Sequence, residues 1–318
     1  MRRILVTIAV AGGMISSLFA QQEEQYTQFM QYKLGLNPAY AGSSGGISIS
    51  TLVRNQWIGL DGAPETQLVS FSIPVWNNNL GIGANILRQT IGVTSNYTLE
   101  TAYSYRIRAP RGFLHLGIQG SARLIRTDYG KLRGTQPIDQ DGAIPSSLQS
   151  KLVPNFGAGL YYNSENFYFG LSVPRLLNVN IDLNDDQGII AREVTHAYLM
   201  TGFIARLGGN LALQPQALFK YVKGAPFDAD INVNLLIMER FTVGASYRLG
   251  GSKEKGLGES LAFLMGIQLS DKMLFGMSYD MTLSDLRRYN SGSIEGVLRF
   301  MLAGKSEGGI YDSPRFFF

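Results

Sequence analysis

The feature that most constrains the fold is a pair of long alternating segments between Thr94 and Arg126. One face of the first arm carries Tyr97, Leu99, Thr101, Tyr103, Tyr105 and Ile107, and polar residues mostly fill the positions between them. Successive side chains of a strand point to opposite faces, so the pattern predicts a strand with one apolar and one polar face. A turn at 109–112 reverses the chain, and the second arm alternates from Leu114 to Leu124. Each arm is long enough to cross a bilayer, which takes about 9–11 tilted residues.

Composition limits the alternatives. Charged residues make up 16% of the 318 residues, below the roughly 25% of soluble domains. No apolar run approaches the roughly 20 residues of a transmembrane helix, so a membrane-spanning form of this chain has to be a barrel. The formal charge of +4 falls to +2 without Arg2 and Arg3, too little to indicate a nucleic-acid partner. With no cysteine, disulfides, thiolate metal sites and lipidation of the exported chain are excluded.

The N-terminal residues predict export. Residues 1–20 have the pattern of a signal peptide, with Arg2 and Arg3 before an apolar stretch and Ala20 at the expected cut. In the next segment, 21–46, apolar residues from Tyr26 to Leu34 recur at helical spacing and predict a short amphipathic helix. The pair Asn37-Pro38 would end that helix. We expect a periplasmic segment ahead of the barrel; a plug that enters the barrel is the alternative.

The rest of the chain predicts a barrel over residues 47–302, followed by a periplasmic tail over 303–318. Alternation and turn residues indicate about fourteen strands. The predicted strands are 47–54, 65–73, 79–89, 94–108, 112–126, 155–163, 166–173, 195–207, 210–221, 227–238, 241–250, 260–270, 273–281 and 293–302. The segment 195–207 alternates poorly, because Met200 and Ile204 fall on the polar face.

The connections and the polar face favour a membrane barrel over a soluble one. Every second connection is a tight turn, as at 109–112, 163–166, 208–210, 239–240 and 271–272. Longer loops alternate with them at 127–154, 174–194, 250–259 and 282–292. Short turns at one rim and long loops at the other are typical of outer-membrane barrels. The polar face is rich in glycine and uncharged polar residues, which suits a crowded, wet lumen. The fold class is therefore all-β: a closed antiparallel transmembrane β-barrel. An even number of strands places both termini of the barrel on the short-turn side.

Sequence motifs give little support to a metal site or an enzyme. Asp182, Asn184, Asp186 and Glu193 have the relative spacing of a calcium loop, but Gln187 replaces the expected glycine, so a solvated surface loop is the stronger interpretation. His115 and His196, the only histidines, fall on the lumen face without a third ligand at suitable spacing. No nucleophile elbow, zinc-protease motif or credible carboxylate pair is present. We expect a protein that is not an enzyme and has no cofactor.

Two blocks of residues resemble a known family. The segment from Gln28 through Asn37-Pro38-Ala39-Tyr40-Ala41-Gly42-Ser43 resembles the opening signature of the PorP/SprF outer-membrane proteins of type IX secretion and gliding motility. A second block with Arg54, Gln56, Trp57, Gly59, Pro64 and Thr66 resembles the first loop of that family. Family members usually end in Arg-Phe, and this chain ends in Arg315, Phe316, Phe317 and Phe318. These residues are our candidates for family-specific interactions.

The resemblance implies a role in the outer membrane, surrounded by its lipid. Such proteins are thought to help deliver or anchor cargo that carries a C-terminal secretion domain, and to be linked to periplasmic machinery through an accessory lipoprotein. The competing function is a diffusion channel or small-molecule transporter. A segment that fills the lumen would favour the interaction protein, and an open pore would favour the channel.

Overall fold

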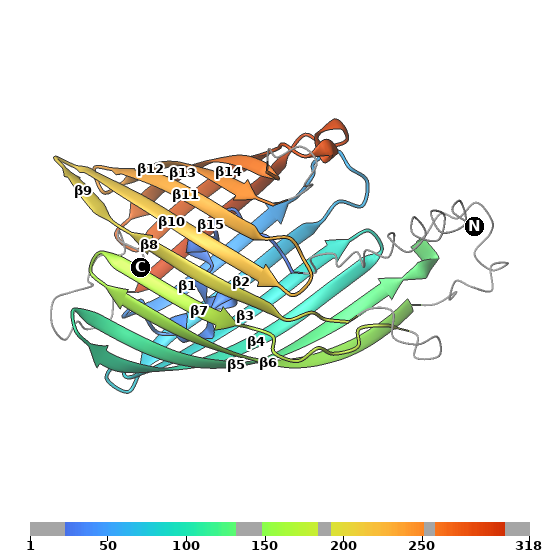
Figure 1. The fold of residues 1–318 in the computed structure, drawn as a ribbon, viewed down its shortest axis with the longest axis horizontal. Helices are drawn as coiled ribbons and strands as arrows, with labels where there is room; N and C mark the ends of the chain where they lie inside the picture. Colours follow the sequence, from blue (N-terminus) through green and yellow to red (C-terminus); the bar gives the residue numbers. More distant parts are fainter. Residues whose placement is uncertain (1–22, 132–147, 184–191, 251–257, 303–318) are drawn as a thin grey trace, which may run out of the picture.

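The structure is a computed structural model that describes residues 23–131, 148–183, 192–250 and 258–302. One antiparallel sheet closes on itself to form a barrel (Figure 1). Its strands are β1 (Ile47–Asn55), β2 (Glu65–Val75), β3 (Leu80–Ile91), β4 (Thr94–Ala109), β5 (Gly112–Asp128), β6 (Leu148–Ser164), β7 (Phe167–Val173), β8 (His196–Phe203), β9 (Ala205–Gly208), β10 (Leu211–Val222), β11 (Asp228–Ile237), β12 (Phe241–Leu249), β13 (Ser260–Ser270), β14 (Met273–Thr282) and β15 (Ser293–Leu302). Among the described residues, no helix has the length and hydropathy of a membrane span.

The barrel closes because β1 pairs with β15 along its whole length and each strand pairs with the next, except that β8 pairs with β10. β10 pairs with β11 on one edge, so β8 and β9, which both pair with β10, lie one after the other along its other edge. The result is a closed barrel of fourteen strands with the short extra segment β9 set off after Ile204. Closure pairs both edges of all the strands except the short β9, as a backbone in hydrocarbon requires. The predicted fold class is confirmed.

Side chains divide between the two faces as the alternation predicts. On the outside, Ile118 is 64% exposed and Phe263 is 56% exposed, whereas Asn232 on the lumen side is fully buried. The apolar band therefore faces outward, where an outer-membrane protein meets lipid. The poorly alternating segment has a structural reason: Met200 and Ile204 point inward and are buried in an apolar cluster.

Two details of the connections differ from the prediction. β6 begins at Leu148 instead of 155, and Pro154 pairs with Ala122 within the ladder, so the connection after β5 is shorter than expected. The two-residue connection 92–93 is short although it lies at the end that carries the loops 56–64, 174–195 and 283–292. We call this end the long-loop end, and the end with the turns 76–79, 165–166 and 271–272 the short-turn end. At the long-loop end, β4, β5 and β6 project beyond the other strands (Figure 1).

Residues 23–46 lie inside the barrel, and we call them the luminal plug. The plug is drawn in dark blue within the sheet in Figure 1. It is built from three short turns, η1 (Phe29–Gln31), α2 (Lys33–Leu36) and η2 (Pro38–Tyr40), so the expectation of one amphipathic helix is wrong. The chain breaks after Leu36 because Asn37 is extended before a proline, and its side chain accepts a hydrogen bond from the backbone of Ala39. Two further short turns, η3 (Tyr129–Lys131) and η6 (Asp285–Arg288), lie in the connections.

Candidate functional site: the plugged lumen

The luminal plug runs along the barrel from one end to the other. At its start, Glu23 contacts Arg175, which follows β7 at the long-loop end. Near its other end, the backbone N–H of Gly42 donates to Oγ of Ser72, close to the turn between β2 and β3. The described chain therefore begins at the long-loop end, although both terminal strands of the barrel end at the short-turn end. Residues 23–46 therefore do not lie outside the short-turn rim. They pass through the lumen to reach β1.

The first group of contacts that holds the plug, the Arg54 cluster, lies between β1, β14 and β15. Arg54 Nη2 is 2.7 Å from Asp280 Oδ2, and Nη1 is 3.1 Å from Glu295 Oε2. The plug completes the cluster: the backbone N–H groups of Thr27 and Gln28 donate to the two oxygens of Glu295, at 3.0 and 2.8 Å. All of these side chains are buried. Their mutual pairing offsets the desolvation that an isolated buried charge would suffer.

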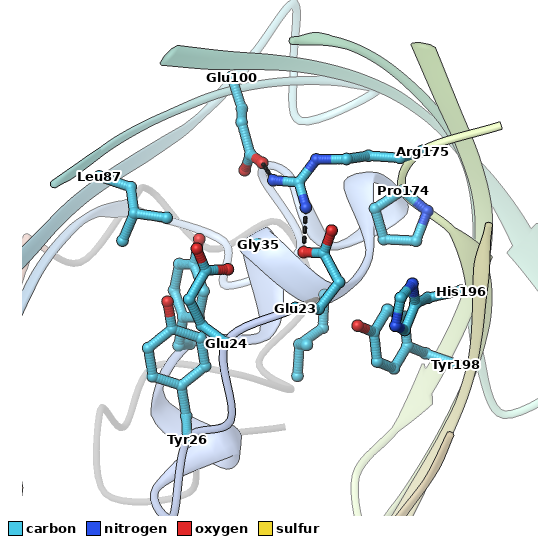
Figure 2. Close-up of a pocket in the computed structure, with 12 residues that line it drawn as sticks. Glu23, Glu24, Tyr26, Gly35, Leu87, Glu100, Pro174, Arg175, His196 and Tyr198 are labelled. Carbon is cyan, nitrogen blue, oxygen red and sulfur yellow. Dashed lines mark hydrogen bonds and ion pairs between the residues drawn. The ribbon is translucent and has the colours of Figure 1, made fainter. Parts of the chain in front are cut away.

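The second group is the Arg175 cluster, and Figure 2 shows Arg175 between Glu23 and Glu100. Arg175 pairs with Glu23 of the plug and with Glu100 of β4, the latter at 2.8 Å. Arg123 of β5 lies 3.4 Å from Glu23 and 3.2 Å from Glu193. Burial alone would raise the pKa of Glu23, but Arg175 and Arg123 outweigh it and lower that pKa to about 2. The start of the plug is thus held as an anion between two arginines.

The third group, the Asp230 cluster, closes the ring on β10, β11 and β12. Asp230 accepts from Lys220 at 2.7 Å and from Arg248 at 2.6 Å, and Lys220 also pairs with Asp228. Arg248 donates to the backbone carbonyl of Tyr26, 3.4 Å away. The three clusters together attach residues 23–28 to strands on all sides of the lumen.

Below the charged clusters, the plug packs against an apolar and aromatic lining. Phe29, Leu34 and Ala39 are buried with Met200 and Leu218 in one cluster. The only cation in this layer among the described plug residues is Lys33, whose Nζ lies 3.7 Å from the centre of the Tyr168 ring. Burial lowers the pKa of the Lys33 amine, and the contact with the ring favours its charged form.

Glycines on the wall make room for the backbone of the plug. A Cβ at Gly117 of β5 would lie 2.3 Å from the backbone nitrogen of Ala39. A Cβ at Gly159 of β6 would lie 2.1 Å from Oδ1 of Asn37. Asn37 uses this proximity, because its Nδ2 donates to the carbonyl of Leu160 at 2.9 Å. The glycines of the predicted lumen face therefore leave the space that the backbone of the plug occupies.

A small cavity remains beside the Arg175 cluster. Its volume is about 20 Å³, room for about one water molecule. Glu24, Tyr26 and His196 lie on its wall (Figure 2). Burial and the charge of Glu23 raise the pKa of Glu24. No group of three histidine or acidic side chains in the described part of the chain is arranged to hold a metal ion.

The candidate residues from the sequence fall into three places. Asn37, Pro38, Ala39, Tyr40 and Gly42 belong to the plug; Arg54 and Thr66 face the lumen and are buried; Gln56, Trp57, Gly59 and Pro64 form the loop after β1. Arg315, Phe316, Phe317 and Phe318 lie outside the described residues, as do Asn184 and Asp186 of the calcium-like segment. Glu193 of that segment pairs with Arg123 in the lumen.

Sequence reasoning missed several of the residues that hold the plug, among them Glu23, Arg175, Asp280 and Glu295. A signal was available for two of them, because Asp280 and Glu295 alternate with outward apolar residues and so fall on the lumen face. A charged residue at such a position needs a partner inside the barrel. The identity of that partner depends on contacts between residues more than two hundred positions apart.

Comparison with known proteins agrees with this architecture. The chain resembles the toluene transporter TbuX of Ralstonia pickettii, with 8% identity and a TM-score of 0.50 over 85% of this chain and 93% of that one. It also resembles the monoaromatic hydrocarbon channel CymD, with 10% identity and a TM-score of 0.50 over 87% and 92% of the two chains. At this identity the likeness concerns the fold alone. No curated protein sequence matches the chain.

The family comparison is more specific. The family described as "Type IX secretion system membrane protein PorP/SprF" matches residues 18–300, which include the plug, the loop after β1 and nearly the whole barrel. A closed barrel with an apolar outer band places the protein in the outer membrane. The chain belongs to the PorP/SprF family of type IX secretion system membrane proteins.

Proposed function

We propose that this protein is a plugged, non-enzymatic barrel that helps deliver or anchor secreted cargo at the cell surface and connects it to periplasmic secretion machinery. The observation that carries the proposal is the attachment of residues 23–28 to opposite walls of the lumen through the Arg54, Arg175 and Asp230 clusters. A diffusion channel needs a free path through its lumen. An interaction protein needs only a rigid barrel with two exposed ends.

The two ends of the barrel would meet different partners. In outer-membrane barrels the short turns face the periplasm and the longer loops face outward. By this rule the long-loop end would meet the C-terminal domain of secreted cargo. The short-turn end and the tail 303–318 would meet periplasmic components, including an accessory lipoprotein.

The loop 56–64 is our candidate for the cargo contact. Its backbone is tied to the neighbouring loop: Ile58 N–H donates to the carbonyl of Gly292, and Ser291 N–H donates to that of Ile58, both at 2.8 Å. Ile58 and Leu60 are each 36% exposed at its tip. Apolar side chains held at a rigid exposed edge suit a protein contact, because little conformational entropy is lost on binding.

A pair of tryptophan substitutions tests this assignment. Trp57→Ala should reduce cargo display at the cell surface while the amount of folded barrel stays normal. The matched control is Trp76→Ala, which changes the only other tryptophan, 80% exposed at the short-turn end. It should leave cargo display unchanged. If Trp57→Ala removes barrel and cargo in equal measure, the residue has a structural role and the cargo assignment is wrong.

The second candidate function is a small-molecule channel, suggested by the fold shared with TbuX and CymD. Conductance of the purified protein in planar bilayers separates the two functions. The proposed interaction protein should be silent, whereas a stable open conductance would favour the channel. Affinity isolation from crosslinked envelopes should in turn recover cargo and periplasmic machinery as the main partners.

A further inference from the structure

Few charged residues lie on the outer surface of the barrel, and two of them are arginines. Among outward-facing strand positions of the described chain, the charged residues are Glu65, Arg88, Arg126 and Asp128. Arg88 and Arg126 are exposed and have no hydrogen-bond or ion-pair partner among the described residues. Asp128 pairs with Lys131 at 3.3 Å, so it does not neutralise Arg126.

The two arginines lie close together around β4. Arg88 of β3 is directly opposite Tyr97, and Arg126 of β5 is directly opposite Ser95. Directly opposed residues of antiparallel strands point to the same face. Tyr97 and Ser95 are two positions apart on one strand, so both guanidinium groups can reach a group bound over this part of β4. Tyr97 lies between them and is 40% exposed.

Along the barrel axis, Arg88 and Arg126 lie at the edge of the apolar band. Towards the short-turn end, the outward neighbours are Ile86, 62% exposed, and Leu99, 51% exposed. Towards the long-loop end they are Thr90 and Asp128, which pair with Glu65 and Leu148 respectively. An arginine at such a boundary lies at the level of lipid headgroups, with acyl chains beside the apolar positions below it.

We propose that Arg88 and Arg126, with Tyr97 between them, bind the phosphate of an outer-leaflet glycolipid of the lipid A class. The planar guanidinium forms paired hydrogen bonds to phosphate oxygens and is suited to this ligand. A free phosphate would use the same arginines but would leave Ile86 and Leu99 without a contact. The position of the pair at the long-loop end assigns the site to the outer leaflet.

Native mass spectrometry of the folded barrel in detergent tests the site. The wild type should retain bisphosphorylated lipid A at least tenfold more strongly than dephosphorylated lipid A, an arm that requires no variant. The double variant Arg88→Gln/Arg126→Gln should lose this preference, because each charge-assisted bond contributes about tenfold. The control Arg108→Gln removes an exposed arginine at the short-turn end of the same hairpin and should bind as the wild type does.

Four outcomes would overturn the proposal. One is equal retention of phosphorylated and dephosphorylated lipid by the wild type. Another is unchanged retention by the double variant, checked for folding by heat-modifiability. The third is displacement of the lipid by millimolar inorganic phosphate, which would make the site a free-phosphate site. If a photo-crosslinker in place of Leu99 captured a protein in intact envelopes and no lipid, the surface would be a protein contact and the lipid site would be rejected.

Discussion

At the residue scale, Arg54 is a buried cation whose removal would leave buried charges unpaired. It is the cation that faces both Asp280 and Glu295, and all three side chains are buried. Arg54→Ala should lower the free energy of unfolding by about 3–5 kcal/mol, because it leaves two carboxylates buried without their cation. Urea-dependent unfolding in lipid vesicles measures this change. Arg108→Ala, which removes an exposed arginine, should change the free energy by less than about 1 kcal/mol; similar losses in both variants would contradict the assigned role of the cluster.

Glu23 should give the attachment of the plug a pH dependence. Its pKa in the folded protein is about 2, below the ordinary value of 4.5, because of Arg175 and Arg123. A carboxyl group with a lowered pKa contributes stability above its unfolded pKa and loses that contribution as the pH falls through the folded value. The difference in unfolding free energy between the wild type and Glu23→Gln should therefore be constant from pH 7 to about 4.5 and should shrink towards pH 2. A difference that does not change with pH would show that the ion pairs contribute nothing.

At the element scale, the fit between plug and wall depends on glycine. Gly117→Ala would place a Cβ against the backbone of Ala39, and neither backbone can yield easily. We expect the plug to shift and the labelling rate of a cysteine at position 39, introduced as Ala39→Cys, to rise. The chain has no native cysteine, so the label reports this site alone. Gly120→Ala on the same strand is the control, because its nearest neighbour would be Oγ1 of Thr101 at 3.9 Å; it should not change the labelling.

The strands also allow a direct test of which face meets lipid. Ile118→Arg should cost about 2–4 kcal/mol, because a charge is placed on the lipid-facing band. Ser150→Arg, on the same outer surface but directly opposite Arg126 near the long-loop end, should cost about 0–1 kcal/mol. A substitution of Gln119, on the opposite face, would not serve as a control, because this residue is buried and its Nε2 donates to the carbonyl of Pro174 at 3.0 Å. Equal costs for Ile118→Arg and Ser150→Arg would argue against the outer band.

The sequence could predict the strands but not the conformation of the plug. Strand positions follow from a local period of two, so residues such as Val233 and Phe263 could be assigned to the outer face without a structure. The sequence predicts the start of β6 too late. Proline lacks an N–H donor and indicates a strand boundary, whereas Pro154 lies within the ladder. The plug has no such local rule. Its turns are fixed by partners far along the chain, as when Ser104 donates to Ala41 and Arg299 to Tyr40.

At the scale of the whole molecule, the barrel and the plug make separate contributions. The barrel wall is complete without the plug, since every strand except the short β9 pairs with a neighbour on both sides, and β1 closes on β15. The plug depends on the wall for nearly all of its partners. Removal of the plug should therefore leave a barrel that still forms but has a wet lumen lined by polar groups without their plug partners, among them Asp280 and Glu295.

Deletion of residues 23–40 from the exported chain tests this division of roles. The deleted protein should remain heat-modifiable and resistant to protease in the outer membrane, because strand pairing is intact. In planar bilayers it should conduct, whereas the full-length barrel should be silent. A folded, silent deletion variant would mean that the wall closes the lumen unaided. A full-length protein that conducts as strongly as the variant would mean that the plug does not block the lumen, and the interaction function would then lose its main structural support.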